Sequence, residues 1–119
     1  MTTKAEMRQR VAEDLALVPI GQSPENQDQA RIDATFDEVY ERLKEKGLAT
    51  WASTAGVPTK LTPYFALMME EKLLTTYSVP EGRFNRIKLD AGAGGDIAMN
   101  ALAELAIPEY DTTDGDAGF

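Results

Sequence analysis

The stretch that most constrains what this chain can fold into is residues 62–77, TPYFALMMEEKLLTTY. Thr62 is suited to cap a helix and Pro63 to its first turn, where a missing backbone N–H has no cost. The apolar stripe of this stretch is much wider than one face: Tyr64, Phe65, Leu67, Met68, Met69, Leu73 and Leu74. A helix that is apolar on more than one side is buried or enclosed by its neighbours. We therefore predict a central core helix; the alternative is that part of its apolar surface meets other subunits.

Residues 3–18 are predicted to form the first helix. Thr3 with Glu6 three residues later makes a capping box, in which each side chain satisfies a free backbone N–H at the helix start. The stripe expected to face the core consists of Met7, Val11, Leu15 and Val18. Pro19 ends the helix, and Ile20 after it is expected to be a core anchor.

The second helix has sequence signals at both ends. Ser23 is the predicted N-cap, Pro24 suits the first helical position, and Gly47 is a strong candidate for the residue just past the C-terminus. Apolar residues recur between these ends at the spacing of one helix face: Ile32, Phe36, Val39 and Leu43. The charged residues of this segment are expected on a solvated outer face.

Residues 48–61 have no helical period and are predicted to form a long loop, with one short extended piece around residues 49–53. Loops of about a dozen residues are uncommon in compact domains and are often functional. Trp51 is the only tryptophan of the chain. It either folds back over the core or anchors a contact with another subunit, because tryptophan is usually buried but is also enriched at interfaces.

The last predicted helix covers residues 81–105. Its seam combines apolar and small residues at alternating helical spacings: Phe84, Ile87, Ala91, Gly94, Ala98, Ala101 and Leu105. A glycine costs about 1 kcal/mol in a helix relative to alanine, and close approach of another helix would compensate for the glycines at positions 92–95. The alternative is a break into two helices at Gly94 and Gly95, with Asp96 capping the second.

The composition narrows the chemistry that is available. The chain has no cysteine and no histidine, so it lacks a thiol nucleophile, the usual ligands of structural zinc and the most common general base. Glu70 and Glu71 lie about 100° apart around a helix and do not form an aligned acid–base pair. We therefore expect a protein that is not an enzyme, with no catalytic residue, no cofactor and no metal site.

The charge balance is acidic. The 20 acidic and 12 basic residues give a net charge of −8, which disfavours free binding to nucleic acid because that requires clustered lysine and arginine. The one basic cluster, Lys60, Arg83, Arg86 and Lys88, is predicted to pair with the surplus acidic side chains. No apolar run reaches the roughly 18 residues needed to span a bilayer, and the N-terminal residues lack the apolar centre of a signal peptide. We expect a cytoplasmic protein without membrane contacts.

Residues 107–119 differ in composition from the rest of the chain. Ile107 and Pro108 stop the last helix, and the residues after them carry four acidic and no basic side chains. We predict one helical domain, residues 1–106, followed by a flexible acidic tail, residues 107–119. Tyr110 and Phe119 are the apolar points of this tail, as expected if it docks on a partner. The alternative is a solvated tail that only aids solubility.

Three segments carry a resemblance to a known family. They are AEDLALVPIGQSP at residues 12–24, VPTKLTPYFALMMEEKL at residues 57–73, and residues 83–105, which end in AMNALAEL. Over residues 8–106 this order of helix lengths, turns and small residues resembles the head-to-tail connector, or adaptor, proteins of tailed bacteriophages. It is most similar to their podovirus-type packaged-DNA stabilisation proteins, also called tail accessory factors. The glycines at 92–95 and the lack of histidine and cysteine depart from the pattern.

Together, these patterns predict an all-α fold: a four-helix bundle-like domain with a long loop after the second helix and an extended acidic C-terminal tail. The resemblance implies a structural virion protein at the head–tail junction. In that family a ring of copies, typically twelve, attaches under the portal vertex after genome packaging. The ring extends the DNA channel, helps retain packaged DNA and offers a platform for the next tail component.

The resemblance also implies the partners of this chain. They are the portal protein ring, further copies of the chain, a downstream tail component, and double-stranded DNA that passes through the channel without sequence-specific binding. The expected portal or intersubunit contacts are Trp51, Val57, Ile107, Tyr110 and Phe119. The alternative function is a cytosolic helical protein-binding module or regulator.

Overall fold

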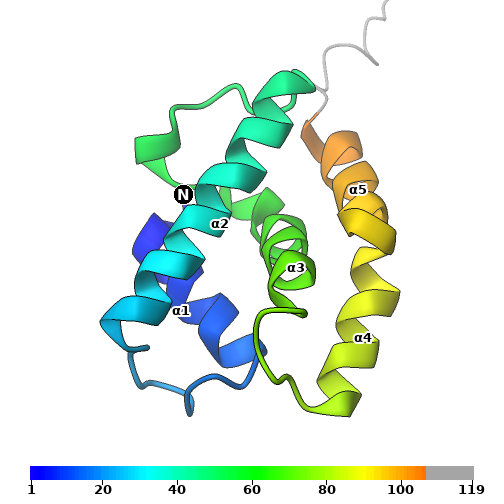
Figure 1. The fold of residues 1–119 in the computed structure, drawn as a ribbon. Coiled ribbons are helices and arrows are strands. Elements are labelled where there is room, and N and C mark those ends of the chain that lie inside the picture. The colour runs from blue at the N-terminus through cyan, green and yellow to red at the C-terminus, as the bar shows by residue number, and fades with distance from the viewer. Residues whose placement is uncertain (107–119) are drawn as a thin grey trace, which may run out of the picture.

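The structure is a computed structural model that describes residues 1–106 and arranges them around one central helix, α3 (Figure 1). The α-helices are α1 (Lys4–Asp14), α2 (Asn26–Glu45), α3 (Thr62–Leu73), α4 (Glu81–Ala91) and α5 (Asp96–Ala106). Three short 3₁₀ helices lie between them: η1 (Ser53–Ala55), η2 (Thr59–Leu61) and η3 (Ala93–Gly95). Residues 1–106 contain no β-strand, so the predicted all-α class is confirmed. None of the helices in this range is long and apolar enough to cross a membrane.

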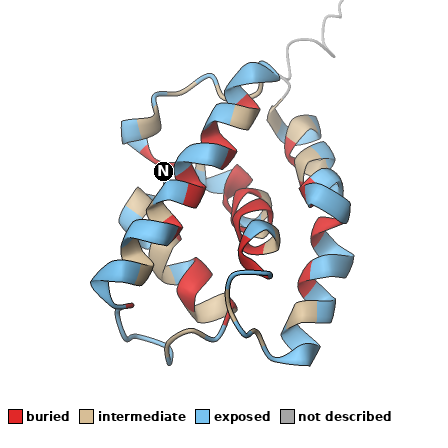
Figure 2. Ribbon diagram, viewed as in Figure 1, coloured by how far each residue is buried: buried red, intermediate tan, exposed pale blue. Residues whose placement is uncertain are grey.

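Helix α3 is enclosed on most of its circumference, as its wide apolar surface predicts. It packs against α1, α2, α4 and α5, and Figure 2 shows the buried residues concentrated on α3 and on the sides of its neighbours that face it. The ring of Phe65 lies 4.9 Å from that of Phe36 on α2, centroid to centroid. Most of its apolar surface is therefore used inside one subunit.

Both ends of α3 differ from the prediction. Leu61, not Thr62, occupies the N-cap. The Thr62 hydroxyl donates instead to the carbonyl oxygen of Pro58 and is hydrogen-bonded to the hydroxyl of Thr2 at 2.7 Å. The helix ends at Leu73 rather than at Tyr77, because the backbone N–H of Tyr77 bonds to the carbonyl of Leu73 in a closing turn.

Helix α1 begins as predicted and ends earlier. The capping box of Thr3 and Glu6 is present in both directions, at 2.9 and 3.1 Å. The helix stops at Asp14 because Ala16 adopts a left-handed conformation with φ 59°. The N–H of Leu17 then bonds to the carbonyl of Ala12 at 2.9 Å, the pattern of a Schellman motif that glycine usually makes.

Ile20 is not a core anchor, and that prediction is wrong. Its side chain is 89% exposed. The adjacent backbone N–H of Gly21 donates to Glu13 Oε2 at 2.9 Å, and Gln9 donates to the carbonyl of Gln22 at 2.7 Å. These bonds hold the turn against α1 through polar atoms and leave Ile20 in solvent. The bond from Gly21, followed by one from Gln9, lowers the pKa of Glu13.

Helix α2 supplies the second wall of the core. The predicted stripe is confirmed, since Ile32, Phe36, Val39 and Leu43 are all buried. The predicted stop is also confirmed: Gly47 has φ 75°, and Leu48 N–H bonds to the carbonyl of Leu43 at 2.8 Å.

The predicted start of α2 is wrong. The helix begins at Asn26 after Glu25, which makes no side-chain cap. Pro24 is buried ahead of the helix, and its carbonyl accepts a bond from Gln29 Nε2 at 2.8 Å. The segment at residues 23–24 therefore belongs to the connection rather than to the helix.

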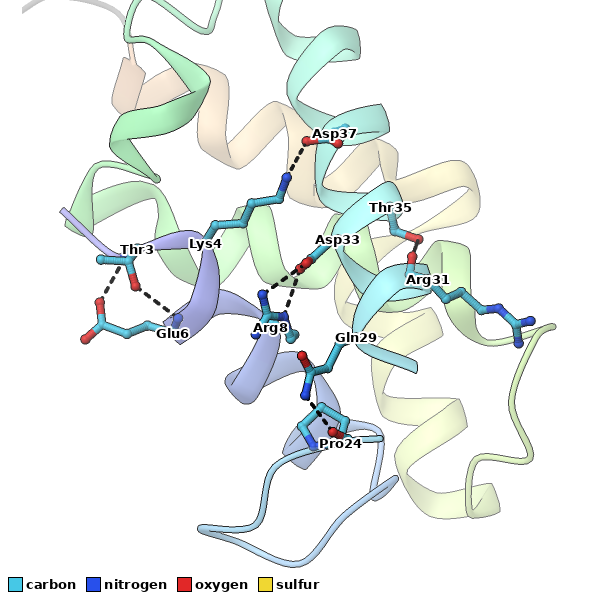
Figure 3. Close-up of polar contacts among 10 residues, drawn as sticks. All are labelled: Thr3, Lys4, Glu6, Arg8, Pro24, Gln29, Arg31, Asp33, Thr35 and Asp37. Carbon is cyan, nitrogen blue, oxygen red and sulfur yellow. Dashed lines mark hydrogen bonds and ion pairs between the residues drawn. The ribbon is translucent and has the colours of Figure 1, made fainter. Parts of the chain in front are cut away.

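Two ion pairs join α1 to α2 along their outer edge (Figure 3). Arg8 makes a two-pronged contact with Asp33 at 2.9 and 3.0 Å. Lys4 donates to Asp37 at 2.8 Å. Because the Arg8 pair is bidentate and half-buried, it fixes the register of the two helices more firmly than an exposed pair would.

The helix predicted for residues 81–105 is broken, so the alternative interpretation is correct about the break, although Asp96 is the first residue of α5 rather than its cap. Gly92, Gly94 and Gly95 all have positive φ values, between 63° and 79°, which separates α4 from α5. Arg42 of α2 holds the bend: it donates to the carbonyl of Gly94 at 2.6 Å and to the carboxylate of Asp96 at 3.0 Å. Asp96 thus pairs with α2 from the first turn of α5.

Candidate functional site

The loop at residues 48–61 is tied to the core by its tryptophan. The indole N–H of Trp51 donates to the carbonyl of Gly56 at 2.7 Å, and the hydroxyl of Tyr40 donates to the carbonyl of Trp51. The rings of Trp51 and Tyr40 meet edge to face, with centroids 6.1 Å apart. Trp51 is half-buried against the core, so its inner side covers the core and its outer side remains accessible to solvent.

Val57 lies on the inner side of the same loop. Its side chain is fully buried, and its backbone exchanges two hydrogen bonds with Thr2, at 2.7 and 2.8 Å. This isolated bridge replaces the extended piece expected around residues 49–53, where η1 begins instead. Trp51 and Val57 are therefore close in space, and of the two only Trp51 presents side-chain surface. The other predicted contacts, Ile107, Tyr110 and Phe119, lie outside the described residues.

Gly56 is the position in this loop at which a side chain is least tolerated. It has φ 96°, and a Cβ atom there would lie 2.1 Å from the carbonyl oxygen of Thr2. We expect Gly56→Ala to lower the free energy of unfolding by about 2 kcal/mol or more, because the strained backbone and the steric clash add. Urea unfolding followed by the fluorescence of Trp51 measures this change.

Gly82→Ala is the matched control. Gly82 is helical, and a Cβ atom there meets nothing within 4 Å, so this variant is expected to be neutral or up to about 1 kcal/mol more stable. Equal effects at the two glycines would contradict the fixed pairing of the loop with Thr2.

A cavity of about 390 Å³ lies between α1, α3 and α4. Six charged residues line it: Arg10, Asp14, Glu70, Arg83, Arg86 and Asp90. Pro63, Leu67 and Ile87 form its apolar part. The volume falls within the range of small-ligand pockets, which combine an apolar lining with a few placed polar groups.

Glu70 is the unusual member of this cavity. It is 2% exposed, and its Oε2 atom is buried without a hydrogen-bond partner among residues 1–106. The pKa of Glu70 is raised to about 10, mainly by burial and then by a hydrogen bond with Asp14 and the charge of Asp14, while the charge of Arg10 acts in the opposite direction. At neutral pH the carboxyl of Glu70 is therefore protonated and uncharged.

The arginines of the cavity are held to different degrees. Arg83 donates to the carbonyls of Glu13 and Asp14, at 3.3 and 3.0 Å, and so binds the C-terminal end of α1. Arg10 lies 3.6 Å from the carboxylate of Asp14. Arg86 has no ion pair or hydrogen bond within the described part of the chain. Its exposed guanidinium is the one available for an added ligand.

Of the four basic residues predicted to pair with acidic side chains, only Lys88 does so within residues 1–106, and the sequence does not predict the cavity. Lys88 pairs with Glu71 at 3.7 Å, as the surplus of acidic groups suggests, and Lys60 lies apart in η2. Arg10 comes from a helix that is distant in sequence. The available signal is the position of Glu70, which directly follows Met68 and Met69 in a helix apolar on several sides and so must itself be enclosed.

No group of three or more potential metal-ligating side chains occurs within residues 1–106. Comparison with known proteins gives no relative: no family model matches the chain, and neither a curated protein nor a solved structure is detectably similar to it. The function must therefore be argued from the residues and their geometry.

Proposed function

We propose that this chain is a head-to-tail connector of a tailed bacteriophage, a structural virion protein without catalytic activity. Copies of the chain form a ring, typically of twelve, under the portal vertex. The ring extends the DNA channel, helps to retain packaged double-stranded DNA and receives the next tail component. The proposal is supported by the resemblance of residues 8–106 to that family and by the all-α architecture, in which the fourth predicted helix is bent.

The observation that carries the proposal is a set of three large apolar side chains exposed on α4 and α5. Leu89 is 77% exposed and Ile97 is 56% exposed, and Leu105 follows on the same helix as Ile97. Large apolar side chains exposed on neighbouring helices favour a contact with another protein. When one surface of each copy binds a different surface on the next copy, the copies form a closed ring if the rotation between neighbours divides the full circle.

The charge of the chain is compatible with a DNA channel. With a net charge of −8, most of the surface repels the phosphate backbone, so DNA can pass without being held. We assign the portal contact to residues 107–119 together with Trp51, which presents the accessible face of the 48–61 loop.

The direct test is assembly with a portal. The genes that neighbour this one should encode a portal, a terminase and a capsid protein, and that portal is the one to purify. We expect electron microscopy of the mixture to show a symmetric ring of added density on one end of the portal. A chain that stays separate from the portal and remains small would overturn the connector function and favour the helical binding module.

Introducing charge on the α4–α5 surface should prevent assembly. We expect the double variant Leu89→Glu and Ile97→Glu to lose ring formation on the portal, because two charges would be buried without partners at the contact. Native mass spectrometry of the portal mixture measures the number of copies bound. Both side chains are exposed, so the free energy of unfolding should change by no more than about 0.5 kcal/mol per site.

Ile20→Glu is the control for this double variant. Ile20 is equally apolar and exposed but lies in the connection between α1 and α2, and its replacement should leave assembly intact. Ring formation by the double variant at wild-type yield would show that the α4–α5 surface is not the contact.

A further inference from the structure

We propose that the cavity between α1, α3 and α4 binds the acidic segment at residues 107–119 of the same chain. This assignment concerns the free chain before assembly; it goes beyond the connector function, in which the same segment leaves the cavity to contact the portal. The cavity is the binding site, Arg86 is its free cation, and acidic side chains of the segment are the ligands.

The charge of the cavity is opposite to that of the segment. Three arginines line the cavity, against Asp14 and Asp90, while Glu70 is neutral at pH 7. The cavity is therefore positive overall, although the chain as a whole has a net charge of −8. The segment at residues 107–119 is the complement, since it carries Glu109, Asp111, Asp114 and Asp116 and no basic residue.

The side chains of the cavity are arranged to bind carboxylates and an aromatic ring. Arg83 is fixed by two main-chain carbonyls at the end of α1, so its guanidinium is already oriented before a ligand arrives. Arg86 is one turn further along α4 and is free to make a two-pronged contact with a carboxylate. The apolar wall of Leu67, Pro63 and Ile87 accommodates an aromatic ring, and the segment provides Tyr110 and Phe119 beside its acidic residues.

The length of the segment is sufficient for it to reach the cavity. The segment begins where α5 ends, and thirteen residues, 107–119, extend to about 45 Å. The radius of gyration of the Cα atoms is 15.3 Å, well below that length, so the segment is long enough to reach a cavity on its own subunit. A short tether also gives an effective concentration in the millimolar range, which favours its own segment over that of another copy.

The absence of cysteine makes the test direct, because a single cysteine can be spin-labelled without side reactions. A nitroxide attached to the full chain at Ala117→Cys should broaden the amide signals of Leu67, Arg86 and Ile87 in low salt. We expect Arg86→Gln to reduce the broadening about threefold or more, and about 0.5 M NaCl to abolish it. Neutralising Glu109, Asp111, Asp114 and Asp116 as the corresponding amides should have the same effect as salt.

Lys60→Gln is the matched control, because it removes the same charge from an exposed residue outside the cavity. It should leave the broadening unchanged. No broadening at the cavity, or an equal loss in the Lys60→Gln and Arg86→Gln proteins, would overturn the proposal. Broadening that occurs only between a spin-labelled chain and a separate isotope-labelled chain would also overturn it, because the segment would then occupy another copy.

Discussion

Glu70→Gln is expected to stabilise the protein by about 3 kcal/mol at pH 7. The carboxyl of Glu70 must be protonated on folding, because burial, together with the neighbouring Asp14, raises its pKa from 4.5 to about 10. Taking up that proton costs about 1.4 kcal/mol for each pH unit above the unfolded pKa. Glutamine has nearly the same shape, needs no proton and can donate an N–H to Asp14.

The sign of the pH dependence follows from the direction of the shift. Between pH 4.5 and about 10 the folded protein binds one more proton at Glu70 than the unfolded protein does, so stability falls as pH rises. The contribution of Glu70 is fully present below pH 4.5 and is lost progressively up to pH 10. The wild type and Glu70→Gln should therefore be equally stable near pH 4.5 and diverge above it.

Urea unfolding at several pH values, followed by Trp51 fluorescence, measures this divergence. Glu71→Gln is the neighbouring control. It removes a partly buried contact with Lys88 at 3.7 Å and should change stability by less than about 1 kcal/mol at pH 7, because Lys88 itself stays largely in solvent. Parallel stability curves for wild type and Glu70→Gln from pH 4.5 to 8 would mean that Glu70 is not enclosed as the structure places it.

Phe65→Ala should be the most destabilising single substitution, with a loss of about 3–5 kcal/mol. Phe65 is fully buried in the central helix and contacts the ring of Phe36 at 4.9 Å. Truncation removes the transfer energy of the ring, opens a void and deletes the aromatic contact. The free energy of unfolding of a small domain is about 5–15 kcal/mol in total, so this loss is a large part of the stability.

Phe65→Leu keeps the measurement possible if the alanine variant does not fold. It should cost less, since it fills most of the same volume. Leu89→Ala is the control at an exposed apolar position and should change stability by less than about 0.5 kcal/mol. A loss below about 1 kcal/mol for Phe65→Ala would contradict the central position of α3.

The helices with regular periods could be predicted from the sequence. The stripe of Ile32, Phe36, Val39 and Leu43 is local and unambiguous, and so is the glycine stop at Gly47. The enclosure of α3 also follows from its composition, because no single neighbour could cover its apolar surface.

The ends and connections could not be predicted, because contacts distant in sequence decide them. Ile20 is exposed because Glu13 and Gln9 bind the turn beside it. The bend after α4 depends on Arg42, which is more than 50 residues away from Gly94 in sequence. The burial of Glu70 requires α1, α3 and α4 to meet, and no spacing within α3 reveals the proximity of Asp14.

Arg42 also determines where the end of the described chain points. The three glycines of positive φ between α4 and α5 would permit many angles between the two helices, and the guanidinium on α2 selects one of them. The direction in which α5 leaves the bend is thus set by a residue of α2. A change at Arg42 would alter the angle of α5 without altering any residue within that helix.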